Sequence, residues 1–388
     1  MAKVLWNPSE DRKNSSLIQQ FIDKSSLNFQ TYFDLHKWSI SKMEDFWAEF
    51  WDFSGIVYSK KYDKVLSNPV MPGAKWFEGS ELNYAENLLS GKPEQVAIIS
   101  AGESRENQTF TFSELNEAVA SAQKGLEKLG VKKGTRIAAF VPNCVETVIL
   151  MLAATSSGAI WTSCSPDFGS QGVIDRFGQV EPSILIVANG YHYNGKIHAL
   201  EDKINGVLET IDSIENVICI NFVDMACSLS HNSVVNYDTL LLEEAKIPKF
   251  VQLPFDYPLY IMYSSGTTGP PKSIIHGAGG TLIQHLKEHQ LQCDIQEGRD
   301  TLFWFTTCGW MMWNWLISGL ASGATIVLYD GSPSHPDLSA LWKIVEKTRI
   351  THFGTSPKFL AACSNSDLEP KKEADLSSVK SLLSTGAP

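Results

Sequence analysis

The chain has 388 residues, 43% of them hydrophobic, and a formal net charge of -11 at neutral pH. A chain of this length and composition buries enough apolar surface to form two or three domains, which excludes intrinsic disorder. The negative charge argues against a general nucleic-acid binder, which would carry a basic stripe. It favours a small-molecule partner and leaves room for one local basic pocket that holds a phosphorylated ligand.

The seven cysteines are scattered and never form a C-x-x-C pair. They therefore indicate neither a disulfide framework nor a zinc ribbon, and a reducing cytosol fits them best. The first sixteen residues are polar and contain no apolar run, so no secretory signal is expected. Residues 145–163 are the most apolar segment, but they contain Glu146 and a Thr-Ser-Ser-Gly centre. We expect a buried helix followed by a strand there, and no membrane span.

Residues 1–95 are unusually rich in aromatic side chains. Phe46, Trp47, Phe50 and Trp51 have the spacing of one face of a helix. Aromatic stripes of this kind usually belong to a core. The region is therefore predicted to be a packing layer laid against a larger body.

From about residue 96 onward, strand-like and helix-like segments alternate. This alternation predicts an α/β fold with mostly parallel sheets covered by helices on both faces. One helix is predicted over 111–130, with Thr111 or Ser113 as its N-cap and Gly130 at its end. A second helix is predicted over 145–158. The predicted strands are 95–100, 136–142, 159–164, 183–188, 216–221 and 324–330.

The segment Tyr263–Ser273, YSSGTTGPPKS, combines hydroxyl residues and glycines with one lysine. Glycines let a backbone approach a ligand closely, hydroxyls and free amides donate hydrogen bonds, and a lysine supplies charge, so the segment indicates a phosphate-binding loop. A Walker A loop needs a glycine where this chain has Pro271, and a helix where residues 273–276 are strand-like. A flexible linker is disfavoured because apolar strands flank the segment. The remaining interpretation is a loop that joins two strands, 257–266 and 272–277.

The same loop, followed by Pro-Lys, resembles the phosphate loop of the adenylate-forming superfamily, which includes acyl-CoA synthetases and luciferases. Residues 75–89 and 306–331 extend the resemblance across the chain, to the short-chain acyl-CoA synthetases and among them to those that activate acetoacetate. The fold implied is the large N-terminal domain of an adenylate-forming enzyme. In that reading residues 1–95 are the N-terminal packing region and residues 96–388 are the AMP-binding (adenylation) domain, truncated.

Members of this family activate a carboxylate with MgATP, release pyrophosphate and transfer the acyl group to coenzyme A. The resemblance implies that Lys272 and Thr267 act in catalysis, because charge builds on the leaving pyrophosphate and fixed donors stabilise it. Mg²⁺ would be held largely by phosphate oxygens and water, and no metal site on the protein is expected. The phosphate-binding residues implied are Ser264, Ser265, Gly266, Thr267, Thr268, Gly269 and Lys272.

The resemblance also implies where the other ligands bind. Trp310, Met311 and Met312 are expected to contact a short acid, acetoacetate in the first place, with acetate or propionate as alternatives. Related acetyl-CoA synthetases tend to have an aspartate where this chain has Thr307. The role implied by acetoacetate is the use of ketone bodies for lipid synthesis. The other positions implied are Gly386, Ala387 and Pro388 at the adenine ring and Lys196 at the 3′-phosphate of coenzyme A.

His285 and His289 stand four residues apart on a predicted helix and could bind zinc. No glutamate follows His285 in an H-E-x-x-H pattern and no third ligand is evident, so a solvated helix face is the favoured interpretation. We expect neither a structural nor a catalytic zinc ion.

By comparison with the family, the chain stops directly after the adenine turn. On that basis we expect it to lack the magnesium carboxylate, the ribose-binding aspartate and the small C-terminal domain with its catalytic lysine, and to be inactive by itself. The alternative to an enzyme is then a protein that only binds a nucleotide or a partner.

Overall fold

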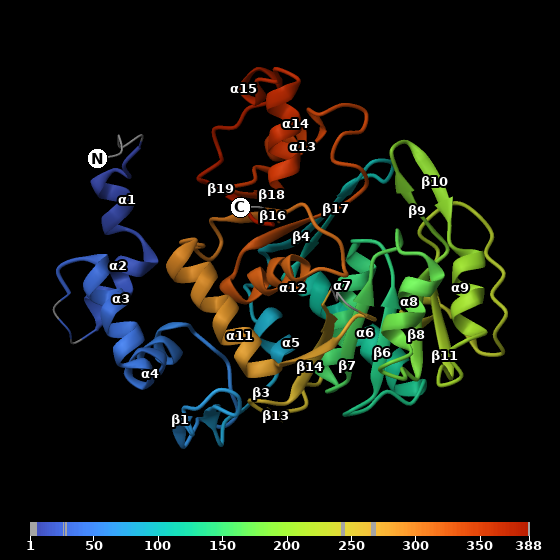
Figure 1. The fold of residues 1–388 in the computed structure, drawn as a ribbon, viewed down its shortest axis with the longest axis horizontal. Coiled ribbons are helices and arrows are strands. Elements are labelled where there is room, and N and C mark those ends of the chain that lie inside the picture. The colour runs from blue at the N-terminus through green and yellow to red at the C-terminus, as the bar shows by residue number, and fades with distance from the viewer. Residues whose placement is uncertain (1–5, 26, 28, 242–244, 265–268, 387–388) are drawn as a thin grey trace.

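Two mostly parallel β-sheets form the body of the molecule in the computed structural model (Figure 1). The structure describes residues 6–25, 27, 29–241, 245–264 and 269–386. The larger sheet has seven strands in the order β12-β11-β8-β6-β7-β14-β15, and the smaller has six in the order β19-β18-β16-β17-β4-β5. All neighbouring strands are parallel except the pairs β14–β15 and β4–β5. The predicted α/β fold class is confirmed.

Each predicted strand is present with small differences at its ends, and strands that were not predicted complete the two sheets. The seven-stranded sheet contains β6 (Arg136–Phe140), β7 (Ile160–Cys164), β8 (Ile184–Ala188), β11 (Asn216–Ile220), β12 (Val234–Asn236), β14 (Pro258–Tyr263) and β15 (Ser273–Gly277). The six-stranded sheet contains β4 (Val96–Gly102), β5 (Gln108–Thr111), β16 (Thr301–Trp304), β17 (Thr325–Asp330), β18 (His352–Thr355) and β19 (Ser381–Ser384). Short two-stranded pairs are formed by β1 (Lys64–Ser67) with β2 (Lys75–Glu78), β3 (Glu81–Leu82) with β13 (Leu253–Pro254), and β9 (Gly190–Tyr193) with β10 (Lys196–Ala199).

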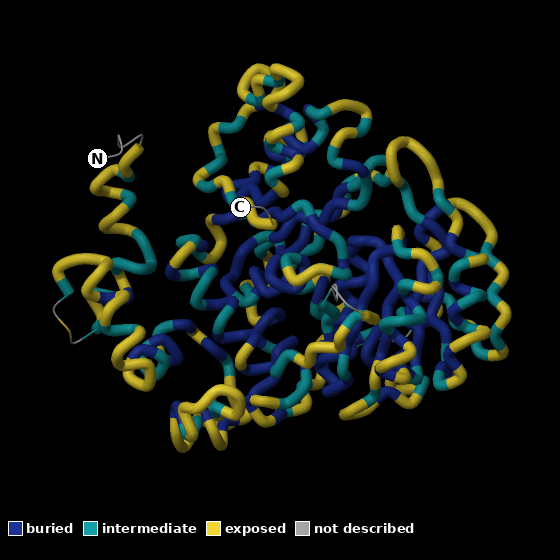
Figure 2. The backbone as a smooth tube through the Cα atoms, in the orientation of Figure 1, coloured by how far each residue is buried: buried dark blue, intermediate teal, exposed yellow. Residues whose placement is uncertain are grey.

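Helices surround and separate the sheets. The helices are α1 (Glu10–Asn14), α2 (Leu17–Lys24), α3 (Tyr32–Ser41), α4 (Met43–Phe53), α5 (Tyr84–Leu88), α6 (Phe112–Lys128), α7 (Val145–Ser156), α8 (Ser170–Phe177), α9 (Glu201–Leu208), α10 (Tyr237–Leu240), α11 (Ala278–Lys287), α12 (Met311–Ser318), α13 (Ala340–Thr348), α14 (Pro357–Asn365) and α15 (Pro370–Glu373). A π-helical turn, η1 (Glu288–Gln292), continues α11, and a 3-10 turn, η2 (Gly319–Ser322), continues α12. Figure 2 shows the buried backbone running through both sheets and the space between them.

Local sequence explains where these helices start and how deeply they lie. The hydroxyl of Thr111 accepts from the backbone of Glu114, whose carboxylate accepts in return from the Thr111 backbone, so α6 begins with a capping box. Gly130 follows its end with a φ of 84°. Every residue of α7 is buried, which confirms the predicted buried helix. Within the described residues, no helix has the length and apolar character needed to cross a membrane.

The aromatic N-terminal region packs as predicted. Phe46, Phe50 and Trp51 of α4 are buried, and Trp47 is half-buried against the same cluster. Trp51 stacks near Phe77, with 4.6 Å between the ring centroids. Edge-to-face and offset contacts of this kind add to the burial of apolar area. The helices α1 to α4 thereby form one flank of the molecule (Figure 1).

The prediction of a solvated face for His285 and His289 is wrong. Both side chains are buried, because α12 and η2 pack on the side of α11 that carries them. His285 Nδ1 lies 2.7 Å from Ser318 Oγ, and the ring of His289 lies edge-on to Trp315 at 4.3 Å. Burial lowers the pKa of His285 to about 3, so that the imidazole is neutral at physiological pH.

Candidate functional site

The predicted phosphate loop is the turn of the antiparallel hairpin β14–β15. Tyr263 pairs with Ser273 at the end of the ladder, and the Ser264 backbone N–H then donates to the Lys272 carbonyl at 3.0 Å. A strand leaves the loop where a Walker A loop would begin a helix. The interpretation as a loop between two strands is therefore confirmed. Ser265, Gly266, Thr267 and Thr268 lie outside the described residues.

Gln179, just beyond α8, fixes the outgoing arm of this loop. Its Nε2 donates to the Pro271 carbonyl at 2.7 Å, and its Oε1 accepts from Ser273 Oγ at 3.0 Å. The Lys272 side chain is exposed and forms no ion pair with any described residue. Because no described acidic side chain neutralises the Lys272 ammonium group, its charge is available to a phosphate ligand at this loop. The sequence did not indicate Gln179, because no local pattern reports a contact between segments about ninety residues apart.

The segment that contains the predicted acid-binding residues lies where the two sheets meet. Ser163 Oγ at the end of β7 donates to the Cys308 carbonyl at 2.7 Å. Trp313 Nε1 donates to Asn143 Oδ1, beyond β6, at 2.9 Å. In Figure 1, α12 accordingly lies near the centre, between the strands of the two sheets. Ligands of open parallel sheets bind at the carboxyl ends of the strands, which is the edge that these contacts join.

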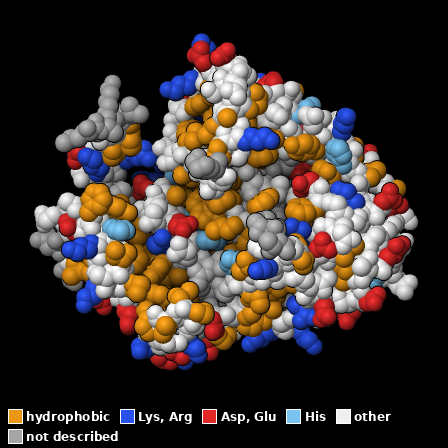
Figure 3. Space-filling view, in the orientation of Figure 1, with side chains coloured by type: hydrophobic (Ala, Val, Ile, Leu, Met, Phe, Trp, Pro, Cys, Tyr) orange, Lys and Arg blue, Asp and Glu red, His pale blue; other side chains and the backbone are white. Residues whose placement is uncertain are grey.

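The first turn of α12 presents large side chains to solvent. Trp310 is 60% exposed and Met311 41% exposed, whereas Met312 is half-buried and Trp313 is 0% exposed. Figure 3 shows hydrophobic side chains reaching the surface across the middle of this face of the molecule. Clustered aromatic and methionine side chains often belong to the hydrophobic core, but the exposure of Trp310 and Met311 rules out that alternative for these two residues. Their contact with an acid remains a prediction.

Three buried hydroxyl or amide oxygens at this edge have no hydrogen-bond partner among the described residues: Thr307 Oγ1, Asn314 Oδ1 and Thr355 Oγ1. Thr307 follows β16, Asn314 lies in α12 and Thr355 ends β18. Leaving a buried polar group unpaired costs about 1–3 kcal/mol, which a bound ligand or water can recover. The carboxyl edge of the sheet is therefore rich in unused hydrogen-bonding capacity.

The predicted adenine turn follows the edge strand β19. Ser384 pairs with Thr355, so that the turn begins at the same carboxyl edge as the unpartnered Thr355 hydroxyl. Gly386 has a φ of 101°, a conformation that favours glycine, and a Cβ placed there would meet nothing within 4 Å. Ala387 and Pro388 lie outside the described residues.

Lys196 is the first residue of β10 in the hairpin β9–β10. The backbone N–H groups of Asn194 and Gly195 both donate to the Glu103 carboxylate at 2.8 Å, which ties the hairpin to the loop after β4. In Figure 1 this hairpin lies at the right, away from α12. Lys196 is exposed, and its contact with coenzyme A remains a prediction.

A group of carboxylates lies at the end of β17. Asp330 Oδ2 has no hydrogen-bond partner among the described residues, and Arg105 pairs with Glu146 at 2.7 Å. Burial, with the like charge of Glu103 nearby, raises the pKa of Asp330 to about 7. Among the described residues no three His, Cys, Asp or Glu side chains are grouped so as to hold a metal ion.

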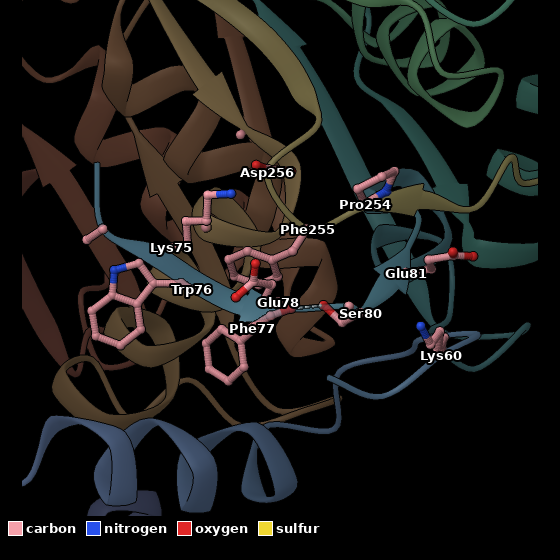
Figure 4. Close-up of a pocket in the computed structure, with 14 residues that line it drawn as sticks. Lys60, Lys75, Trp76, Phe77, Glu78, Ser80, Glu81, Pro254, Phe255 and Asp256 are labelled. Atoms are coloured by element: carbon pink, nitrogen blue, oxygen red, sulfur yellow. Dashed lines mark hydrogen bonds between the residues drawn. The ribbon is translucent and has the colours of Figure 1, made fainter. Parts of the chain in front are cut away.

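A cavity of about 520 Å³ lies at the opposite end of the β14–β15 hairpin (Figure 4). Lys75 and Glu78 of β2 border it, with Asp256 and Gly277 on the other side. Gly277 pairs with Pro258, five residues before Tyr263, so this cavity lies roughly 17 Å from the phosphate loop. None of the predicted ligand-binding residues lines it.

Comparisons with known proteins match the whole chain. The model of the family described as "AMP-binding enzyme" matches residues 86–388, and that described as "Acetyl-coenzyme A synthetase N-terminus" matches residues 32–88. An acetoacetyl-CoA synthetase of Xenopus tropicalis is 44% identical over 405 aligned positions, covering 100% of this chain and 60% of that protein. A malonamoyl-CoA synthetase of Penicillium aethiopicum is 40% identical, with 100% and 58% covered.

A solved structure agrees with these sequence matches. The acetoacetyl-CoA synthetase of Streptomyces lividans superposes with a TM-score of 0.95 at 38% identity, over 100% of this chain and 60% of that one. The chain thus spans about 60% of the length of the relatives it matches. Since the family model covers most of the sequence, the chain belongs to the AMP-binding enzyme family.

Proposed function

We propose that this protein is an acid–thiol ligase that activates acetoacetate with ATP and passes it to coenzyme A, giving acetoacetyl-CoA, AMP and pyrophosphate. The observation that carries the proposal is that relatives named acetoacetyl-CoA synthetase align with all of the chain. The role in the use of ketone bodies for lipid synthesis is part of the same proposal. A reducing compartment, the cytosol, is proposed because all seven cysteines are free thiols.

Within this proposal the β14–β15 turn holds the β- and γ-phosphates of ATP. The exposed amine of Lys272, which pairs with no acid among the residues that the structure describes, would neutralise charge on the pyrophosphate, while Gln179 keeps the outgoing arm in place. The hydroxyl and glycine residues of the turn, Thr267 among them, would donate the remaining hydrogen bonds. Mg²⁺ would be bound by phosphate oxygens and water.

The acid would bind beside the first turn of α12. Trp310, Met311 and Met312 supply apolar surface, and the two sheets bring this turn to the edge that carries the phosphate-loop hairpin. The names of the relatives point to a common substrate chemistry, since acetoacetate and malonamate are both short acids with a carbonyl at C3. Side chains that fill an acid pocket exclude a larger acid by steric overlap. This effect is stronger than the loss of binding affinity that a smaller acid suffers because it lacks one methylene group.

The test is formation of acetoacetyl-CoA by this chain extended to the full length of its relatives, of which it spans about 60%, with ATP, Mg²⁺, coenzyme A and acetoacetate, and with octanoate as the comparison acid. Acetoacetate-dependent release of pyrophosphate is the expected result, with acetoacetate well ahead of octanoate in kcat/KM. Binding of ATP without any thioester would favour the alternative of a nucleotide-binding protein. Equal or better turnover of octanoate would contradict the proposed acid site.

A further inference from the structure

The Asn314 side chain is a buried, unpartnered polar group in the helix that carries the predicted acid-binding residues. It is 3% exposed, and its Oδ1 has no hydrogen-bond partner among the described residues. Its Nδ2 contacts only a thioether, Met262 Sδ, at 3.7 Å. Sulfur of this type is a weak acceptor, so an amide with two donors and two lone pairs is almost unused here. In a buried position this is costly unless a further partner binds.

Helix geometry places this amide beneath the proposed acid-binding surface. Met311 and Asn314 are three residues apart in α12 and therefore share one face of the helix. Asn314 lies about 4.5 Å further along the helix axis than Met311. Met311 is 41% exposed and Asn314 is 3% exposed, so this face carries an exposed side chain one turn before the buried amide.

The amide also lies next to the strand that enters the phosphate loop. Met262 is in β14, two residues before Ser264. An acid whose carboxylate points to ATP in this loop would therefore extend its other end towards α12. The polar group at that position is the primary amide of Asn314. Rotation about its terminal side-chain bond can direct either an N–H or the oxygen towards a ligand.

We infer that Asn314 recognises the C3 carbonyl of the acid by donating an N–H of its side-chain amide to that oxygen, which makes Asn314 the residue that selects 3-oxo acids over simple fatty acids. This inference rests on the proposed function and narrows its substrate class. A site built to hydrogen-bond a polar group discriminates strongly against an analogue without that group, because the protein's own polar atom is then left unpaired. Butyrate is that analogue, with the same number of carbon atoms and a methylene at C3.

The experiment measures the dissociation constants of acetoacetate and butyrate for the 388-residue chain by titration calorimetry, in the wild type and in Asn314→Leu. The wild type is expected to bind acetoacetate more tightly. Asn314→Leu, of similar size but without hydrogen-bonding atoms, should lower the acetoacetate-to-butyrate preference by about tenfold. A structural role alone would weaken both acids alike and lower the melting temperature, whereas the ratio would stay constant.

The matched control is Thr307→Val, which removes the other unpartnered side-chain oxygen of this segment at nearly constant shape. It should keep the preference of the wild type. A preference that survives in Asn314→Leu, or one that is lost in Thr307→Val instead, would overturn the inference and leave the proposed function standing. A wild type that binds both acids equally, or neither of them, would overturn the proposed substrate and this inference together.

Discussion

The phosphate-loop hairpin and the segment from Thr306 to Asn314 form two neighbouring parts of the proposed site, and they are held in different ways. The hairpin is closed by its own ladder between β14 and β15, with a turn of only nine residues between the two strands. The other segment is held by partners far away in the sequence, Ser163 to Cys308 and Asn143 to Trp313. The hairpin can therefore be predicted from a short stretch of sequence, whereas the position of the segment from Thr306 to Asn314 depends on the assembled fold.

The consequence is clearest in two tryptophans three residues apart. Trp310 is 60% exposed, while Trp313 is 0% exposed and donates to Asn143. The same residue type is thus solvent-exposed in one position and a structural anchor three residues later. Trp313 is the buried one of the two because its side of the segment faces the ends of β6 and β7.

The largest effect is expected for the anchor. Trp313→Ala should lower the free energy of unfolding by about 3–5 kcal/mol, since it leaves a large cavity and an unpaired Asn143. Trp310→Ala, the matched exposed position, should change it by about 0.5 kcal/mol or less. Urea unfolding followed by circular dichroism measures both. Equal losses of unfolding free energy in Trp313→Ala and Trp310→Ala would contradict the assignment of Trp313 as an anchor and Trp310 as a surface residue.

Lys272→Ala tests the locally built part. In the chain extended to the full length of its relatives, acetoacetate-dependent pyrophosphate release should slow by about 10²–10³, the effect of removing one preorganised charge contact. No loss of stability is expected, because the side chain is exposed. Lys347→Ala, an exposed lysine on α13, is the control and should keep the wild-type rate. An unchanged rate in Lys272→Ala would refute the assignment of the phosphate loop.

The buried carboxylate of Asp330 gives a prediction that depends on pH. Its pKa is raised from 3.8 to about 7 in the folded protein. Between these values the folded state holds a proton that the unfolded state has lost, so the free energy of unfolding falls as pH rises from about 4 to about 7, by at most about 1.4 kcal/mol per pH unit. Asp330→Asn should remove this contribution.

The measurement is the difference in stability between wild type and Asp330→Asn at several pH values. Exposed Asp375, whose pKa is lowered to about 2 by hydrogen bonds from Ser377, is the control position. Asp375→Asn should leave the slope between pH 4 and 7 as in the wild type. A slope that persists in Asp330→Asn would show that another group causes it.

The smallest effect is expected for Gln179→Ala. The variant loses two exposed hydrogen bonds to the arm that leaves the phosphate loop, which should cost about 1 kcal/mol. Amide exchange in β15 should become several-fold faster. Gln171→Ala in α8 removes a bond to Asp175 on the same helix and is the matched control. Unchanged exchange in β15 would mean that the hairpin closes without help from Gln179.

Much of the fold could be predicted because it follows from local rules. The alternation of strand-like and helix-like segments gave the α/β class, and Thr111 with Glu114 marks the start of α6 through a capping box. The mostly apolar sequence of α7 indicated a buried helix, and all of its residues are buried. The burial of His285 and His289 was missed, because a helix pattern shows spacing and does not show which neighbouring element covers each face.

By itself, the sequence determined the α/β alternation, the strands and helices predicted from it, and a loop that joins two strands at residues 264–272, since backbone hydrogen bonds and side-chain alternation act over a few residues. Only the tertiary structure decided that Gln179 supports this loop, that Trp313 is an anchor beside the exposed Trp310, and that Asn314 is buried with its amide unused. These contacts join residues 92 and 170 positions apart for Gln179 and Trp313. Which distant segments meet depends on how the sheets pack, and no local spacing encodes that choice.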